Sequence, residues 1–305
     1  MENTVKAPIT GTEDAKTPIN IISFVDKIKQ YRRSPLSFIL MLLVCLAAVF
    51  TIGILFVLVA YILIKGIPNV TPALFEWTYT SDNASMMPAL VNTLLITFVT
   101  LVISVPIGVF TAIYLVEYAK KGSRFVKLIR VTAETLSGIP SIVYGLFGFI
   151  LFSITLGLGN SILSGIITLA IMILPLIIRT SEEALLSVSD SYREGSFGLG
   201  AGKLRTIFKI VLPSAMPGIA SGIILAIGRI VGESAALIYT AGTNPAVPKS
   251  LLSSGRTLSV HMYCLMNEGL GTNQAYGAAV VLLLLVLLIN GVSEYVTHRL
   301  TAKTK

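Results

Sequence analysis

Long apolar runs separated by short polar stretches dominate the pattern of the chain. Six such runs lie at about residues 36–64, 89–116, 131–154, 162–178, 216–238 and 276–292. A helix of about 20 apolar residues crosses the hydrocarbon core of a bilayer. Thr135–Ile178 carries no charge and is too long for one crossing, so we expect it to turn at Gly157–Ser161. The pattern predicts an all-α polytopic membrane protein with six transmembrane helices.

The polar stretches divide the chain into regions. Residues 1–35 are rich in Thr, Pro and charged residues, and such a composition predicts a largely disordered segment. Residues 36–64 would form the first transmembrane helix. Residues 89–298 would form a core of five transmembrane helices that includes a polar loop at 192–213. Residues 299–305 would form a short tail.

The positions of the charges predict the orientation in the membrane. Only 12% of the residues are charged, whereas a soluble domain carries about 25%. Basic residues gather on alternate sides of the apolar runs, and the opposite loops hold only Lys65, Lys249 and Arg256. Cytoplasmic loops carry an excess of Lys and Arg, so both termini are expected in the cytoplasm. Because the net charge of +8 is explained in this way, we expect membrane lipid and not nucleic acid as a partner.

The loop at 192–213 predicts a compact helical hairpin between two spans. Tyr192–Leu199 could form a short helix, and Gly200–Gly202 permits a sharp turn because glycine reaches positive φ at little cost. Lys203–Leu212 reads as a second helix, and Pro213 marks the passage into the next span. The second helix carries an apolar face formed by Leu204, Ile207, Phe208 and Val211. Such a hairpin suits docking in a groove of another protein.

The spacing within this loop resembles the EAA loop of ABC importer permeases. That motif runs Glu-Ala-Ala, three residues, Gly, nine residues, Ile-x-Leu-Pro. The positions in register are Glu194, Gly200, Ile210, Leu212 and Pro213, and Gly195 and Ser196 replace the two alanines. The resemblance implies a type I ABC importer permease fold and a loop that couples the chain to an ATPase subunit. An ordinary helical hairpin between spans is the alternative interpretation.

Arg229 and Glu233 are the only charges within the fifth apolar run, and their spacing places them on one face of a continuous helix. Ionisable groups at membrane depth are costly and usually face a cavity or a partner. A guanidinium presents a planar fork of donors that suits phosphate oxygens. We therefore expect Arg229 to face an anion pathway with Glu233 orienting it, and Arg179 could add a second charge. Alternatively, Arg229 and Glu233 form a structural ion pair and Arg179 is a cytoplasmic anchor.

Gly138–Gly148, Gly228–Ala236 and Leu258–Tyr263 resemble the PstA-type permease of the phosphate ABC importer. The resemblance covers roughly residue 89 to the end. It implies import of inorganic phosphate across the bacterial or archaeal plasma (inner) membrane. It implies as partners a PstC-type permease in a heterodimer, two PstB-type ATPase subunits that carry ATP and Mg²⁺, and an external PstS-type phosphate-binding protein. It also implies that Arg179, Arg229 and Glu233 belong to the solute pathway.

Other motifs do not support an enzyme or a cofactor in this chain. Gly198–Lys203 lacks the glycine and the Ser or Thr of a phosphate-binding loop, so we expect no ATP site. His261 and His298 fall on opposite sides of the membrane and cannot share a metal or a catalytic triad. The alternatives left open are a permease for sulfate, molybdate or phosphonate, the PstC-type sister subunit, and a non-transporting scaffold or passive anion channel.

Overall fold

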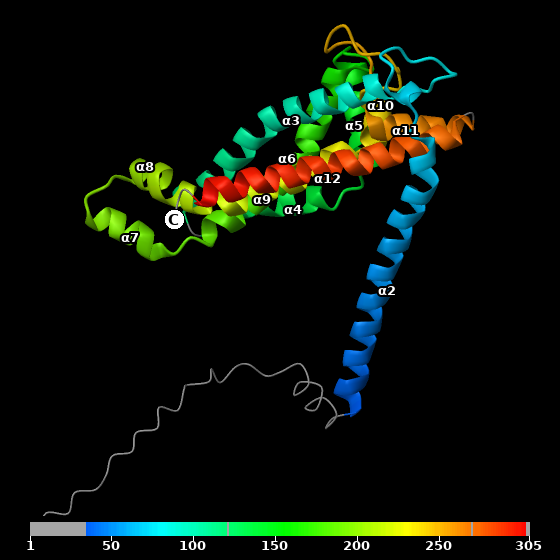
Figure 1. Ribbon diagram of the computed structural model, residues 1–305. Helices are drawn as coiled ribbons and strands as arrows, with labels where there is room; N and C mark the ends of the chain where they lie inside the picture. The colour runs from blue at the N-terminus through cyan, green and yellow to red at the C-terminus, as the bar shows by residue number, and fades with distance from the viewer. Residues whose placement is uncertain (1–34, 121, 270, 303–305) are drawn as a thin grey trace, which may run out of the picture. The chain divides into compact units, whose positions relative to one another are not determined.

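The computed structural model describes residues 35–120, 122–269 and 271–302 (Figure 1). The expectations for residues 1–34 and 303–305 lie outside this range. The described chain is helical and contains no strand. It divides into two bodies, one up to Ala60 and one from Tyr61 onward.

Helix α2 (Pro35–Gly66) contains all the described residues of the first body, and its residues 61–66 belong to the second body. It is apolar on all sides because no charged residue occurs before Lys65. With η1 (Ile67–Asn69) it forms a continuous stretch that is long and apolar enough to cross a membrane, with a mean hydropathy of 3.1 in its most apolar part. A helix that is hydrophobic all round is suited to lipid, which agrees with the predicted first span.

Four long helices form the core of the second body. They are α3 (Met87–Ile113), α6 (Ile162–Leu186), α9 (Leu212–Gly232) and α12 (Thr272–Ala302). Helix α6 packs against both α3 and α9, and α12 packs against α9. Fully buried Ile96, Ile173 and Ile230 contribute to the shared core. Gly222 lets α9 approach α6 closely, since a Cβ atom there would lie 2.1 Å from Thr180 Oγ1.

The third predicted span, residues 131–154, is not one straight helix. The chain forms α4 (Arg124–Ser137) and then α5 (Ser141–Gly148), which continues as the π-helical segment η4 (Phe149–Thr155). The two parts are bent by 103° at the break. Pro140 explains the break, because proline lacks the N–H of the helical ladder and disfavours α-helical backbone at the preceding residue, Ile139. The apolar composition of the run did not reveal this bend.

The turn between the third and fourth runs is confirmed. Gly157 and Gly159 have φ values of 68° and 61°, in the left-handed region that favours glycine. Ser161 caps α6 by accepting a hydrogen bond from Ser164 N. Helix α6 continues past the predicted end at Ile178 to Leu186, so the polar residues of its last turns extend the helix beyond the apolar run.

The fifth predicted span, residues 216–238, is also interrupted. Helix α9 ends at Gly232, and a short helix α10 (Ala235–Thr240) follows after a break. The predicted outer loop before the last span contains a further helix, α11 (Leu258–Glu268), and another short helix, η2 (Pro72–Phe75), precedes α3. Buried Leu258, Val260 and Leu265 hold α11 in the second body.

Five helices of the described chain are long and apolar enough to cross a membrane, or six if the bent α4–α5 pair counts as one span. Figure 1 shows α7 (Asp190–Gly198) and α8 (Lys203–Thr206) at one end of the second body, near the C-terminal end of α12. Helices α10 and α11 lie at the opposite end. The polar loop between α6 and α9 is therefore separated from α10 and α11 by the length of the bundle.

Candidate functional site

The loop at 192–213 folds as a helical hairpin, as predicted. Helix α7 ends where Leu199 N donates to Gly195 O, and Ala201 N then donates to Ser196 O across the turn. Gly200 has a φ of 81°, which explains why glycine is needed at this position. The second arm starts with α8 at Lys203.

The two arms are joined by a buried hydrogen bond between side chains. Ser196 Oγ and Thr206 Oγ1 are 2.8 Å apart, so the serine that replaces an alanine of the EAA pattern has a partner of its own. Ile207 and Val211 are buried in a cluster with Leu185. These contacts tie the hairpin to the end of α6 as well as to the start of α9.

The second arm is not a separate helix that ends before Pro213. Residues Lys203–Gly232 form one helical stretch that passes through the π-helical turn η5 (Ile207–Val211) into α9. Pro213 lies in the first turn of α9, directly after η5. Proline is tolerated there because the π turn has already interrupted the regular hydrogen-bond ladder.

The hairpin exposes a set of apolar side chains. The predicted apolar face is split, since Ile207 and Val211 are buried whereas Leu204 and Phe208 are exposed. Leu199 is 91% exposed at the tip of the turn. We define the hairpin patch as the exposed side chains Tyr192, Phe197, Leu199, Leu204 and Phe208. Exposed apolar side chains that gather on one hairpin are candidates for an interaction site.

The remaining EAA-loop positions lie around this patch. Glu194 and Gly195 are exposed, and no atom lies within 4 Å of the place that a Cβ atom of Gly195 would take. Ile210, Leu212 and Pro213 are half-buried on the arm that leads into α9. The sequence-predicted residues of the coupling loop are thus brought together in one hairpin.

Arg229 and Glu233 do not share a helix face. Arg229 lies half-buried in the last turn of α9, whereas Glu233 follows the end of that helix with extended backbone. Glu233 Oε1 accepts a hydrogen bond from Ala236 N at 3.1 Å, and Glu233 O accepts one from Ser259 Oγ at 2.6 Å. Among the described residues no ion pair joins Arg229 to Glu233. The expectation of a helical i,i+4 pair is therefore wrong, because the helix ends between the two residues.

The helix surface at the two glycines beside Arg229 is open. No atom lies within 4 Å of the place that a Cβ atom would take at Gly228 or Gly232. Gly218, further down the same helix, is instead packed so tightly that its Cβ atom would lie 2.7 Å from Ala184 Cβ. The glycines near Arg229 thus serve no helix contact within the described chain, and they leave this part of α9 accessible.

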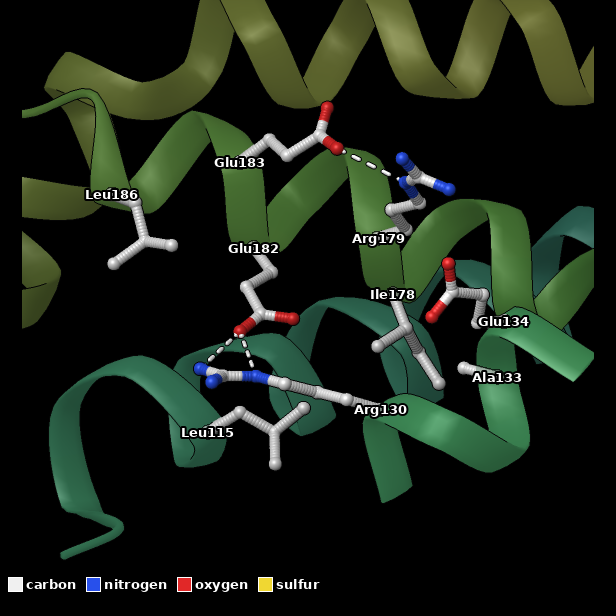
Figure 2. A pocket seen from close by; sticks show the side chains of 9 residues that line it. All are labelled: Leu115, Arg130, Ala133, Glu134, Ile178, Arg179, Glu182, Glu183 and Leu186. Atoms are coloured by element: carbon white, nitrogen blue, oxygen red, sulfur yellow. Dashed lines mark hydrogen bonds and ion pairs between the residues drawn. The ribbon is translucent and has the colours of Figure 1, made fainter. Parts of the chain in front are cut away.

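Arg179 lines a cleft at a different place (Figure 2). The cleft has a volume of about 320 Å³ and is lined by α4, α6 and Leu115. Arg179 Nε donates to Glu183 Oε1 at 3.0 Å, and both side chains are exposed. Arg130 Nε donates to Glu182 Oε1 at 2.7 Å and so joins α4 to α6. No hydrogen bond or ion pair in the described chain connects Arg179 with Arg229 or Glu233.

Sequence reasoning missed a buried pair of basic side chains, Arg256 before α11 and His261 within it. Arg256 is only 3% exposed, and its guanidinium lies 4.5 Å from the ring centroid of Tyr79. His261 is fully buried and packs edge-to-face on the same tyrosine. Burial, together with the nearby Arg256 charge, lowers the pKa of His261 to about 3. The Ala84 carbonyl lies near the imidazole but outside good hydrogen-bonding geometry. The sequence places Arg256 only among the outer-loop charges, because nothing in a Ser- and Gly-rich segment signals burial.

The described residues contain no group of three or more His, Cys, Asp or Glu side chains that could hold a metal ion. Cys45 is exposed and Cys264 is buried, and they lie in different bodies of the chain. The described residues therefore offer no cluster of metal ligands beside the ion pairs and hydrogen bonds given above.

Comparison with known proteins identifies the family. Residues 104–303 match the family described as "Binding-protein-dependent transport system inner membrane component". The chain belongs to this family of ABC importer permeases. The permease is 33% identical over 266 residues to the "Probable ABC transporter permease protein YqgI" of Bacillus subtilis, covering 80% of this chain and 89% of that protein. It is 38% identical over 205 residues to "Phosphate transport system permease protein PstA 1" of Mycobacterium tuberculosis, covering 66% of this chain and 67% of the relative.

Solved structures show the same fold. The permease matches a chain of the bacterial alginate ABC transporter with a TM-score of 0.61 at 17% identity, covering 84% of this permease and 95% of that chain. It matches a chain of the MetNI methionine ABC transporter with a TM-score of 0.54 at 20% identity, covering 70% of this permease and 93% of that chain. The fold is that of type I ABC importer permeases, as the sequence predicted.

Proposed function

We propose that this permease is the membrane subunit of an ATP-driven importer of inorganic phosphate and forms half of its translocation pathway. The observation that carries the proposal is the exposed hairpin with EAA-loop spacing, in a chain whose relatives include permeases named for phosphate transport. The chain itself catalyses no reaction. ATP and Mg²⁺ bind to a separate ATPase subunit, and this chain converts movement of that subunit into access for the anion.

The proposed partners follow from this role. A PstC-type permease completes the pathway as a heterodimer, two PstB-type ATPase subunits hydrolyse ATP, and a PstS-type protein delivers phosphate from outside. The PstA names of several relatives support the PstA-type over the PstC-type position. The hairpin patch supplies the surface for one ATPase subunit, since apolar anchors with a charged rim are typical of stable docking.

The proposed topology is a multi-pass protein of the plasma (inner) membrane with both termini in the cytoplasm. It requires that the bent α4–α5 pair crosses the membrane once, which gives an even number of crossings. The basic residues near the hairpin then face the cytoplasm, in agreement with the positive-inside rule. Helices α10 and α11, at the other end of the bundle, face the phosphate-binding protein.

We assign the anion contact to Arg229. Its guanidinium has no ion pair in the described chain, and the glycines beside it leave the helix accessible. Glu233 contributes by fixing the break after α9 through its bond to Ala236 N. Arg179 would have to release Glu183 before it could bind an anion, so it takes a secondary part in the pathway.

Other interpretations predict different behaviour. Sulfate, molybdate and phosphonate are tetrahedral oxyanions that an arginine fork would also accept, so competition decides between them and phosphate. A scaffold or a passive channel does not need a docking hairpin for an ATPase.

The test is ATP hydrolysis by the complete complex in proteoliposomes. Phosphate-loaded binding protein should raise the rate several-fold over that with the phosphate-free protein. Glu194→Lys should reduce the amount of ATPase that co-purifies, whereas Asp82→Lys, an exposed charge reversal in the opposite loop, should not. A parent complex that retains no ATPase, or hydrolyses ATP equally with and without phosphate, would contradict the proposal.

A further inference from the structure

Helix α7 has few apolar contacts that could hold it in place. Among its residues only Ser196 is buried, and that side chain bonds to the other arm of the hairpin. The side chains of the patch residues Tyr192 and Phe197 are exposed. Burial of apolar surface therefore contributes little to fixing α7 on the bundle, and a polar contact has to do so.

Arg193 supplies this contact. Its Nε and Nη2 atoms donate to Glu117 Oε1 at 3.0 and 2.9 Å. Nη2 also donates to Leu185 O at 3.0 Å, and Nη1 donates to Val188 O at 2.7 Å and to Asp190 Oδ1 at 3.1 Å. All three nitrogens of the guanidinium are thus bonded to acceptors. These acceptors come from the segment that continues α3, from the end of α6, from the linker between α6 and α7, and from the start of α7.

The Arg193–Glu117 pair is shielded from water. The two side chains are 14% and 9% exposed, whereas Asp190, the other acid, is 83% exposed. Charge-assisted hydrogen bonds in such a site are stronger than neutral ones and are screened little by salt. Removal of Arg193 leaves the charge of Glu117 buried without its partner.

The partner Glu117 lies in η3 (Tyr114–Tyr118), a π-helical segment that continues α3. The same segment reaches the other arm of the hairpin, because Lys203 Nζ lies 4.7 Å from the ring centroid of Tyr118. The segment that follows α3 thus contacts the first arm through Arg193 and the second arm through Lys203, directly after the turn. Single π turns inside helices are frequent at functional sites, where they adjust the direction of the helix.

We propose that Arg193 is a positioning residue that locks the coupling hairpin to the ends of the spans α3 and α6. It makes these spans follow the hairpin when a bound ATPase moves it. The inference rests on the proposed function, since it assigns a role only if an ATPase docks on the hairpin patch. Arg193 itself lies outside that patch, so docking and transmission of movement are carried by different residues.

Lysine cannot replace arginine in this role. A guanidinium is planar and holds donors in a fixed fork, so it can bond to the carboxylate and to the two backbone carbonyls at once. An ammonium group is a single centre on a flexible stem, and it would satisfy the charge of Glu117 without fixing the direction of α7. Arg193→Lys therefore keeps the positive charge beside Glu117 but removes the fork of donors that fixes the direction of α7.

The experiment compares Arg193→Lys, Arg193→Gln and Glu117→Gln in the complete complex. Arg124→Lys is the matched control, because Arg124 is exposed at the start of α4 and has no hydrogen bond or ion pair in the described chain. Bound ATPase per permease, ATP hydrolysed and phosphate taken up are measured together. Both Arg193 variants should retain the ATPase but import about tenfold less phosphate per ATP, a typical size for a coupling effect. Glu117→Gln should fall between them and the parent, because its amide oxygen can still accept.

The outcomes distinguish a failure of the proposed function from a failure of the positioning role of Arg193. A parent complex without bound ATPase refutes the proposed function. A normal parent with an unchanged ratio of phosphate to ATP in Arg193→Lys refutes the positioning role, and so does a mere loss of permease abundance at an unchanged ratio.

A second measurement needs only this chain. Spin labels are placed at Tyr192→Cys on α7 and Phe110→Cys on α3, both exposed, with Cys45 and Cys264 replaced. The distance distribution should be narrow with Arg193 and clearly broader in Arg193→Lys, whereas it should stay narrow in Arg124→Lys. An equally narrow distribution in Arg193→Lys would show that other contacts hold the hairpin.

Discussion

Two glycines of the coupling hairpin should respond to alanine in opposite ways. Gly195 lies within α7, and Gly200 lies in the turn with a φ of 81°. At both positions a Cβ atom would meet no other atom within 4 Å. A steric clash is therefore excluded as a cause, and the backbone conformation alone decides the effect of Gly195→Ala and Gly200→Ala.

The magnitudes follow from the two backbone states. Alanine inside a helix is favoured over glycine by about 0.8–1.0 kcal/mol, so Gly195→Ala should stabilise α7. Left-handed backbone costs a residue with a Cβ atom about 1–2 kcal/mol, so Gly200→Ala should destabilise the turn. The two variants should differ by about 2–3 kcal/mol, which corresponds to a roughly 30- to 150-fold difference in the equilibrium for opening the hairpin.

Hydrogen exchange of the α7 amides in the purified permease measures this opening. Exchange should become slower in Gly195→Ala and faster in Gly200→Ala, while the amides of α6 change in neither variant. Retention of the ATPase should decrease only in Gly200→Ala, because alanine at residue 195 adds no contact on the exposed surface. Faster exchange in both variants, or in neither, would refute the argument from backbone conformation.

Three further outcomes are expected. Arg229→Gln should keep normal membrane abundance and lose phosphate uptake. Adding Glu233→Gln should not restore uptake, because the two side chains form no ion pair. Restored uptake in the double variant would show that Arg229 and Glu233 form a structural pair. The stability of the fold should fall as the pH drops from about 6.5 towards about 3, because the unfolded chain protonates His261 and the folded chain does not; the melting temperature of His261→Asn should depend less on pH in this window. In a background without native cysteines, Asp82→Cys should react with an impermeant thiol reagent from outside and Lys203→Cys should not, and the reverse pattern would overturn the proposed topology.

The two arms and the turn of the hairpin could be predicted because their signals are local, whereas the split of the apolar face and the continuation of the second arm into α9 could not. Helix periodicity, the glycines of the turn and the register from Glu194 to Pro213 all depend on residues close in sequence. The same is true of the turn at Gly157 and of the first span. The structure confirmed these features because no distant contact overrides them.

Breaks within apolar runs could not be predicted from hydropathy. The bend after Ser137 follows from a proline that the sequence displays, but an average over an apolar run does not separate one helix from two. The end of α9 at Gly232 is set by Glu233, whose carboxylate bonds to Ala236 N. The burial of Arg256 against Tyr79 depends on residues far apart in sequence. Such tertiary contacts leave no local pattern.

Uptake of labelled phosphate by proteoliposomes that contain the complete complex tests the central claim most directly. The permease pair, the ATPase and the phosphate-binding protein are reconstituted with ATP on the side of the hairpin and phosphate on the other side. We expect uptake that requires ATP and the binding protein, that unlabelled phosphate abolishes, and that excess sulfate or molybdate leaves unchanged. Uptake that proceeds equally without ATP, or that sulfate or molybdate suppresses as strongly as phosphate does, would contradict the account.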